Sequence, residues 1–227
     1  MKTTGIGDVV LLTAVVRDLA AVFPAAEIVV ICGGENAGLA RTLDGACVVE
    51  IPPAEPRRAI ATLRAQRLDW LLDFGQWSRL EALYARLSGA RWTAGFATPG
   101  QHRHAAYDVA VPHRADVSEL ENFRRLAAGG GVASTSLPRL EPVGADELPV
   151  KDPFVVFHLW PGGYRSELRE WPLDSWRELA ARLDSDGYGV VLTGARADAD
   201  RTAAFARSCA GTLRRPPTSL AGRCSLA

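Results

Sequence analysis

Short apolar runs alternate with amphipathic segments along most of this chain, and this alternation restricts the fold more than any other feature. Buried strands are predicted where the apolar runs occur, at 27–32, 46–51 and 70–74. Helical spacing of apolar residues predicts helices over 8–22, 36–43, 57–66 and 77–87. Apolar strands joined by amphipathic helices are typical of a parallel sheet covered on both faces, so the sequence predicts an α/β fold.

The alternation continues to residue 131, is interrupted, and then resumes. Strands over 91–96 and 107–111 and a helix over 118–128 complete a Rossmann-like N-terminal domain at 1–131. Residues 132–152 lack periodicity and contain three prolines, so we interpret them as a linker. A second Rossmann-like domain is predicted at 153–227, with strands at 153–158 and 189–193 and helices at 173–183 and 198–208.

Both ends of the pattern lack elements that an α/β domain normally has. A doubly wound domain usually begins with a strand before its first helix, but only MKTT precedes the first glycine. We therefore expect the first strand to be absent. The second domain has two clear strands, and the closing SLAGRCSLA leads into a further helix, so we expect that domain to be incomplete.

The composition argues against several classes of protein. Lys and Arg number 26, as do Asp and Glu, so the zero net charge gives no indication of nucleic-acid binding. No basic segment followed by an apolar core and a cleavage site opens the chain, and no apolar run is long enough to cross a bilayer. The four cysteines have no metal-ligand spacing, which indicates buried thiols in a reducing cytoplasm; they are Cys32, Cys47, Cys209 and Cys224.

Asp8 is the first candidate for chemistry, because GIGD at 5–8 lies at a turn into a helix, where α/β sheets place ligands. Gly7 allows a substrate to approach the backbone closely. The alternative is that Asp8 only caps the helix, and the residues alone favour this alternative. The third glycine of a dinucleotide fingerprint would fall at Val10, so a dinucleotide site is disfavoured.

The loop after the strand at 153–158 is the second candidate. Glycines followed by cations and a helix start suit a diphosphate, because backbone N–H groups and arginine side chains both match phosphate oxygens. A solvated loop explains the pattern equally well. The candidate residues of this loop are Gly162, Gly163, Arg165, Ser166 and Arg169.

Three further residues or short stretches carry weaker predictions. Asp198 follows a strand and a glycine turn, where an acid either caps the next helix or holds ribose hydroxyls. The stretch His102–His104 lacks acidic partners nearby in sequence, so we expect it on the surface and not in a metal site. We expect Trp171 in the core.

Four segments, taken in order, resemble the ADP-heptose:lipopolysaccharide heptosyltransferases. They are GIGDVVLLTAVVRDLAAVFPAAEI, HLWPGGYRSELREWPLDSWRELAARL, GYGVVLTGARADAD and SLAGRCSLA. The resemblance implies a GT-B fold, in which two Rossmann-like domains face each other across a cleft. It also implies the inverting transfer of a heptose from ADP-heptose to a sugar hydroxyl of the lipopolysaccharide inner core.

The resemblance also implies roles for individual residues. Asp8 matches the catalytic base, and Arg169 matches a basic position that neutralises the leaving diphosphate. Arg165 and Ser166 match the loop near the phosphates, and Asp198 matches an acid near the nucleotide ribose. The first strand of the family, its glycine-rich DTG-type loop and the histidine after that loop have no counterpart in this sequence.

The resemblance implies a nucleotide-sugar donor, a lipid-linked saccharide acceptor, and no metal or cofactor. It implies a cytoplasmic protein with peripheral contact to the inner membrane. Arg57, Arg58, Arg64 and Arg67 could face anionic lipid, although a solvated helix face is the commoner explanation. Two alternatives stay open: a related GT-B transferase with another nucleotide-sugar donor, and an inactive fragment.

Overall fold

The computed structural model describes residues 1–227 except 44, 141–152, 164, 211–212, 214–216 and 220–227. Contacts divide the chain into two compact units, Met1–Val143 and Gly144–Ala227. Both units alternate helices with parallel strands, which confirms the α/β prediction.

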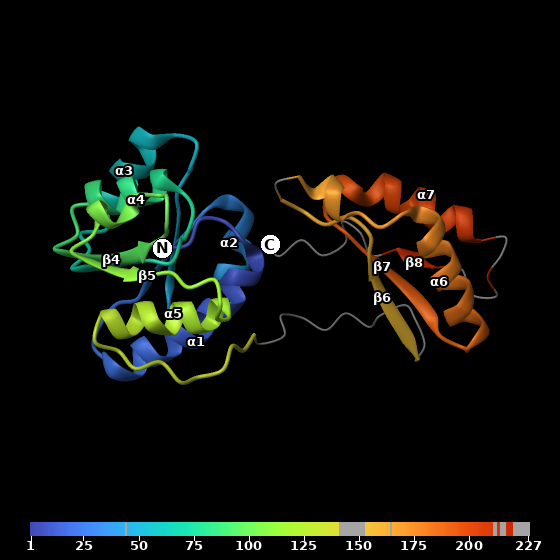
Figure 1. The fold of residues 1–227 in the computed structure, drawn as a ribbon, viewed down its shortest axis with the longest axis horizontal. Coiled ribbons are helices and arrows are strands. Elements are labelled where there is room, and N and C mark those ends of the chain that lie inside the picture. Colours follow the sequence, from blue (N-terminus) through green and yellow to red (C-terminus); the bar gives the residue numbers. More distant parts are fainter. Residues whose placement is uncertain (44, 141–152, 164, 211–212, 214–216, 220–227) are drawn as a thin grey trace. The chain divides into compact units, whose positions relative to one another are not determined.

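Unit 1 follows the predicted order of elements, and each element lies close to its predicted position (Figure 1). Its helices are α1 (Ile6–Val22), α2 (Gly34–Ala40), α3 (Pro56–Ala65), α4 (Arg79–Leu87), the 3-10 helix η1 (Arg103–Ala106) and α5 (Glu119–Gly129). Its strands are β1 (Val29–Cys32), β2 (Cys47–Glu50), β3 (Trp70–Asp73), β4 (Trp92–Ala97) and β5 (Val109–Pro112).

The first residues of the chain lie between β1 and β3 and join the two sheets of unit 1. Lys2 bridges Cys32 in parallel and donates its backbone N–H to the Ile31 carbonyl at 2.8 Å. On the other side, the Met1 carbonyl accepts from the Phe74 N–H at 2.9 Å. Adjacent chain segments therefore run in the order β2, β1, residues 1–2, β3, β4, β5. Among the described residues no strand precedes α1, as expected, although Lys2 forms an isolated parallel bridge beside β1.

Helices cover both faces of this sheet, because strand side chains alternate between two apolar layers. One cluster joins β1 and β4 to α1 and α5 through residues that include Val30, Phe96 and Phe123. The other joins β1 and β3 to α3 and α4 through residues that include Ile31 and Leu71. Figure 1 shows α1 and α5 on one side of β4 and β5 and α3 and α4 on the other.

The start of the predicted linker belongs to unit 1. The Asp18 carboxylate of α1 accepts hydrogen bonds from the backbone N–H groups of Thr135 and Ser136 and from two serine hydroxyls. Val132 is 1% exposed and packs in the cluster of α1 and α5. The predicted linker at 132–152 therefore begins too early, and its remainder, 141–152, lies outside the described residues.

Unit 2 contains a sheet in the order β6-β7-β8 among the described residues. The strands are β6 (Phe154–His158), β7 (Gly189–Thr193) and β8 (Thr218–Ser219), and the helices are η2 (Ser166–Arg169), α6 (Leu173–Ser185), η3 (Arg196–Asp198) and α7 (Ala199–Cys209). A single cluster packs Phe157 and Leu192 against α6 and α7, which lie on the same side of the sheet (Figure 1). The predicted run into a further helix, at 219–227, falls almost entirely outside the described residues.

Trp171 does not belong to the core of unit 2, contrary to expectation. It is 48% exposed and packs edge-on against Trp176, with ring centroids 5.0 Å apart. Trp176 in turn contacts the buried Phe157, with centroids 4.7 Å apart. Trp171 therefore covers a core residue from outside.

Candidate functional site

The N-terminal turn of α1 holds the Asp8 carboxylate. The N-cap position is Gly5, with φ +84°, and no side chain caps this helix end. A Cβ at residue 5 would lie 2.7 Å from Asp8 Oδ2, so glycine is required both for the backbone angle and for the carboxylate. Asp8 is therefore not the cap of α1, although a carboxylate in the first turn still interacts favourably with the helix dipole.

Lys2 is the charged partner of Asp8. Its side chain is 4% exposed, and Nζ lies 2.8 Å from Asp8 Oδ2. The same ammonium donates to Gln76 Oε1 at 2.8 Å and lies 6.0 Å from the centroid of the Phe123 ring. The Asp8 side chain is 26% exposed, so one side of the site is accessible. Gly7 beside it is exposed and faces open space, because a Cβ there would meet nothing within 4 Å.

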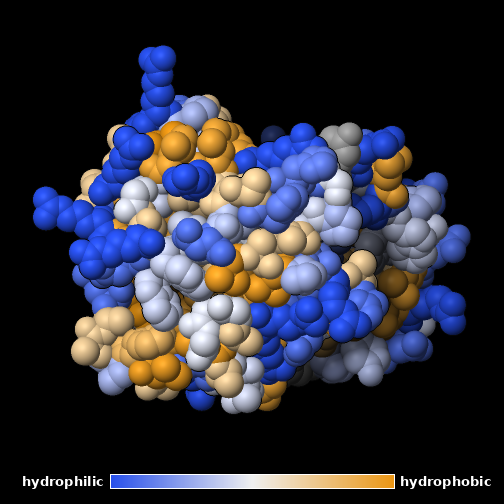
Figure 2. All heavy atoms as spheres, turned by 60° about the vertical axis from the view of Figure 1, so that its left-hand side comes forward, coloured by the Kyte–Doolittle hydropathy of each residue, from blue (hydrophilic) through white to orange (hydrophobic). Residues whose placement is uncertain are grey.

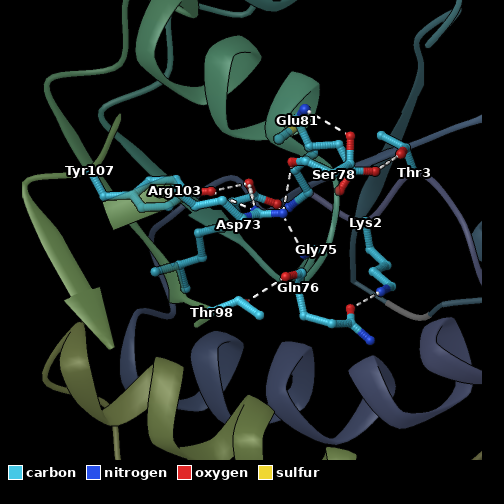
Figure 3. A network of polar contacts seen from close by, with 12 residues as sticks. Lys2, Thr3, Asp73, Gly75, Gln76, Ser78, Glu81, Thr98, Arg103 and Tyr107 are labelled. Carbon is cyan, nitrogen blue, oxygen red and sulfur yellow. Dashed lines mark hydrogen bonds and ion pairs between the residues drawn. The ribbon is translucent and has the colours of Figure 1, made fainter. Parts of the chain in front are cut away.

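A buried ion pair lies behind this turn, at the carboxyl end of β3. The side chains of Asp73 and Arg103 are both 0% exposed, and Nη2 of Arg103 lies 2.8 Å from Asp73 Oδ2. Tyr107 donates its hydroxyl to the same carboxylate oxygen at 2.5 Å (Figure 3). Arg103 also donates to the Ser78 carbonyl at 2.8 Å, and the Gly75 N–H donates to Asp73 Oδ1 at 3.0 Å. Because both charges have several partners, burial of the pair is tolerated.

A second buried carboxylate connects this network to the start of the chain. Glu81 is 5% exposed and accepts a hydrogen bond from the Thr3 hydroxyl (Figure 3). Burial, and then the negative charge of Asp73, raise the pKa of Glu81 above its usual range. Burial, followed by the charge of Asp73, also raises the pKa of Tyr107, so its phenol stays protonated and donates. A Cβ at Gly75 would overlap Glu81 Oε2, so this glycine makes room for the carboxylate.

These contacts separate two roles among the carboxylates of unit 1. Asp73 and Glu81 are buried and serve to fix the chain around residues 1–3 and 75–78. Asp8 is accessible, lies at the carboxyl-terminal edge of a parallel sheet, and can therefore meet a ligand. A cavity of about 500 Å³ near the amino ends of β1 and β3 is lined by α1 side chains such as Leu12 and lies apart from this edge.

In unit 2, the predicted phosphate loop is exposed and is organised by Arg169. Its Nη2 donates to the Gly162 carbonyl at 2.5 Å. Gly163 has φ +94°, and a Cβ there would lie 3.4 Å from the same guanidinium nitrogen. Arg165, with φ +52°, is the N-cap residue of η2, and Ser166 is the first residue of that helix. The structure thus brings two of the predicted residues, Gly162 and Gly163, to the exposed Arg169 guanidinium, and Arg165 and Ser166 lie in the same loop.

Asp198 is engaged within its own segment. Its Oδ2 accepts from the Ala195 N–H at 3.0 Å, and its Oδ1 accepts from Arg201 Nε at 2.9 Å. Asp198 occupies the N-cap position of α7, but its side chain makes no capping hydrogen bond to that helix, and a role toward a ribose stays a prediction. Arg201 lies 4.2 Å from the centroid of Trp160 and 3.5 Å from Glu170 Oε1, so it links Asp198 to the end of the phosphate loop.

Sequence reasoning missed Lys2, Gln76 and the ion pair between Asp73 and Arg103. The expectation that His102–His104 lies on the surface was wrong for Arg103, whose acidic partner lies 30 positions away. A carboxylate at the end of an apolar strand, as at Asp73, could have indicated a buried polar network. Among the described residues, no group of three or more His, Cys, Asp or Glu side chains is arranged to hold a metal ion.

The parallel α/β fold in two units is the GT-B fold, as the similarity to solved structures shows. The profile of glycosyltransferase family 9 (heptosyltransferase) matches residues 60–227, well over half of the chain. The chain belongs to this family.

Solved structures show the same fold at low sequence identity. The E. coli ADP-heptose LPS heptosyltransferase II is 21% identical, with a TM-score of 0.70 over 99% of this chain and 72% of its own. A family 9 glycosyl transferase from Veillonella parvula is 15% identical, with a TM-score of 0.71 over 98% and 68%. E. coli heptosyltransferase WaaC with ADP is 16% identical, with a TM-score of 0.71 over 98% and 75%. No curated protein sequence matches the chain significantly.

Proposed function

We propose that this glycosyltransferase transfers a heptose from ADP-heptose to a sugar hydroxyl of the lipopolysaccharide inner core, with inversion at the anomeric carbon. The observation that carries the proposal is an accessible, ion-paired Asp8 at the sheet edge of a family 9 chain. The printed names of the structural relatives, an ADP-heptose LPS heptosyltransferase and WaaC with ADP, support this donor and acceptor.

Asp8 is the general base of the proposed reaction. The acceptor oxygen attacks the anomeric carbon from the face opposite the diphosphate, and its proton passes to the Asp8 carboxylate. The bond between the anomeric carbon and the β-phosphate oxygen breaks, and ADP leaves with the bonding electrons. A base must lie within hydrogen-bond reach of the proton that it accepts, and the exposed edge of Asp8 meets this requirement.

The donor diphosphate binds at the glycine loop of unit 2 in this proposal. Arg169 neutralises charge on the leaving group, because a guanidinium and a phosphate form strong charge-assisted hydrogen bonds. The backbone at Gly162 and Gly163 and the side chains of Arg165 and Ser166 surround the same phosphates. Asp198 approaches the ribose after Arg201 shifts from its carboxylate. The mechanism uses no metal or cofactor.

Donor specificity tests the proposal directly. Thermal shifts of the purified chain are measured with ADP-heptose, ADP, UDP-glucose and GDP-mannose, and ADP release is measured with a heptose-deficient lipopolysaccharide acceptor. We expect stabilisation by ADP and ADP-heptose alone, together with acceptor-dependent ADP release. Stabilisation by UDP- or GDP-sugars would indicate a transferase with another donor, and an absence of binding and turnover would indicate an inactive chain.

A lipid-linked acceptor requires the enzyme to approach a membrane surface, and α4 supports such contact. Trp77, before this helix, and Leu80 and Leu83 within it are 63%, 36% and 47% exposed. Arg79 and Arg86 flank them, while the acidic Glu81 faces inward. An outward face with tryptophan, leucine and arginine suits an anionic membrane interface. Figure 2 shows unit 1 turned forward, with hydrophobic patches bordered by hydrophilic side chains.

The neighbouring helix α3 adds exposed Arg57, Arg58 and Arg64, and Arg67 follows it. The described helices include no candidate membrane span. The contact that we propose is peripheral and on the cytoplasmic side. Cosedimentation with vesicles of 70% POPC and 30% POPG tests this contact. We expect Leu80→Gln/Leu83→Gln to reduce binding, whereas Leu168→Gln, at a more exposed leucine in unit 2, leaves it unchanged. Equal losses in both variants would contradict the assignment of α4.

A further inference from the structure

The Lys2 ammonium is buried in a way that ties the Asp8 carboxylate to the sheet. The whole residue is 3% exposed, and its Nζ has two side-chain partners, Asp8 and Gln76, each at 2.8 Å. A buried ammonium is costly unless it is paired, so this position requires the Asp8 carboxylate to stay within reach.

Both Lys2 and Gln76 are anchored on elements that cannot easily move. The backbone of Lys2 is bonded to β1, and its neighbour Thr3 donates its hydroxyl to the buried Glu81. The Gln76 carbonyl accepts the Thr98 hydroxyl at 2.6 Å, which attaches it to the end of β4 (Figure 3). The ammonium is therefore held from two sides of the sheet edge.

Only one of the two oxygens of the Asp8 carboxylate contacts Lys2. Oδ2 lies against Lys2, above the space that Gly5 leaves open. The side chain as a whole remains 26% exposed, which leaves room for a ligand. One carboxylate oxygen is therefore held by Lys2, and the other can be directed toward a ligand.

We propose that Lys2, assisted by Gln76, is a positioning residue that fixes the Asp8 carboxylate for its role as general base. The inference rests on the proposed function of Asp8. Lys2 is too buried to touch the substrate, and it acts through Asp8. A displacement of about 1 Å in a catalytic group can reduce the rate by about 10²-fold, so loss of this support should appear in kcat.

A purely structural role for the ion pair predicts a different outcome. If Lys2 only stabilised the start of the chain, replacement would lower stability, and any effect on turnover would not depend on Asp8. Removing one partner of a buried ion pair is destabilising, so Lys2→Met is expected to lower stability as well. Lys2→Met keeps most of the apolar length of the side chain, and turnover is measured below the unfolding transition so that the losses of stability and of catalysis are counted separately.

The ion pair itself can be measured without any assay of activity. The chain contains two lysines, Lys2 and Lys151, so 15N-lysine labelling gives at most two side-chain ammonium resonances. Lys2→Met assigns them. We expect the Lys2 resonance to persist at neutral pH, because burial slows exchange with water, and to shift or disappear in Asp8→Asn. An unchanged Lys2 resonance in Asp8→Asn would overturn the proposal.

A double-mutant cycle tests the consequence for catalysis. We expect Lys2→Met to lower kcat by about 10²-fold with little change in the KM for the donor, and Lys2→Arg to lose less. In the Asp8→Asn background, Lys2→Met should have little further effect, because the two side chains act as one unit. Arg17→Met, an exposed cation of α1, serves as the control and should retain activity.

The outcomes separate the two proposals. Near-normal turnover in Asp8→Asn would contradict the role of Asp8 as the base. A large loss in Asp8→Asn, combined with normal kcat in Lys2→Met, would contradict only the role of Lys2. An equal loss from Lys2→Met in both backgrounds would likewise show that Lys2 acts independently of Asp8.

Discussion

The two candidate sites of this protein are built in opposite ways. In unit 1, Asp8 is held by a lysine that is itself fixed by contacts between residues 74 and 78 positions apart in the sequence. In unit 2, Arg169 contacts a carbonyl seven positions away, and Asp198 contacts an arginine three positions away. The first site is mostly buried, and the second is mostly exposed.

The difference indicates which contacts position the candidate residues of each unit. The carboxylate of unit 1 is placed by tertiary contacts, which suits the general-base role that we propose for it. The loop of unit 2 has mainly local contacts and exposed arginines, so the diphosphate that we propose to bind there could adjust it at low cost. The predictions below test this contrast, beginning with the largest expected effect.

Asp8→Asn should have its largest effect on turnover. Asparagine cannot accept the proton of the acceptor, so we expect turnover to fall by on the order of 10²–10⁴-fold. Thermal stability should also fall, because the substitution leaves the buried Lys2 ammonium without its carboxylate, so turnover is compared below the unfolding transition. ADP binding, assigned to unit 2, should be retained in isothermal titration calorimetry. Near-normal turnover would remove Asp8 from the mechanism.

Arg103→Leu should destabilise unit 1 strongly. The substitution leaves the Asp73 carboxylate buried without its cation, and breaking such a pair costs about 3–5 kcal/mol. Urea unfolding measures the change in free energy. Arg91→Leu is the matched control, because its pair with Asp69 is exposed and should contribute at most about 1 kcal/mol. Similar losses in the two variants would contradict the contrast between buried and exposed contacts.

Arg169→Ala should weaken ADP binding by about 1.5–3 kcal/mol, the scale of a hydrogen bond to a charged group. Arg169→Lys should lose less, because it keeps the charge but not the planar fork. Stability should stay nearly constant, since Arg169 is exposed. Calorimetric titration with ADP measures the affinity. Equal affinities in the wild-type protein and Arg169→Ala would exclude Arg169 from the site.

Asp18→Ala should release the segment at 132–140 from α1 at a cost of about 1 kcal/mol. Partial burial would raise the pKa of Asp18, but hydrogen bonds from the hydroxyls of Ser136 and Ser134, and then from backbone N–H groups, lower it to about 2. Because the folded-state pKa lies below the ordinary value near 3.9, this stabilisation is present above about pH 4 and is lost toward pH 2.

Hydrogen exchange of residues 132–140 and urea unfolding at pH 6 and pH 2.5 measure this effect. The difference in unfolding free energy between the wild-type protein and Asp18→Ala should shrink at the lower pH. Asp69→Ala, at an exposed carboxylate, serves as the control. A difference that is independent of pH would show that the Asp18 hydrogen bonds do not hold the segment.

Much of the architecture follows from local sequence patterns. The spacing of apolar residues in each segment predicts whether it forms a helix or a strand. The strands and helices of both units therefore lie close to their predicted positions. The parallel direction of the sheet follows from the alternation of the elements. GIGD and the glycine loop are recognisable because special turns require glycine. Family membership also follows from the order of the motifs, and the profile match confirms it.

The tertiary structure alone decided which side chains meet. Nothing local distinguishes Lys2 from a surface lysine, or Arg103 from the histidines beside it, because each is defined by a partner 74 or 30 positions away. The exposed position of Trp171 and the packing of residues 132–140 on α1 also depend on contacts that the local sequence does not reveal. Periodicity describes how one element faces the core, whereas the pairing of charges depends on how distant elements are brought together by the fold.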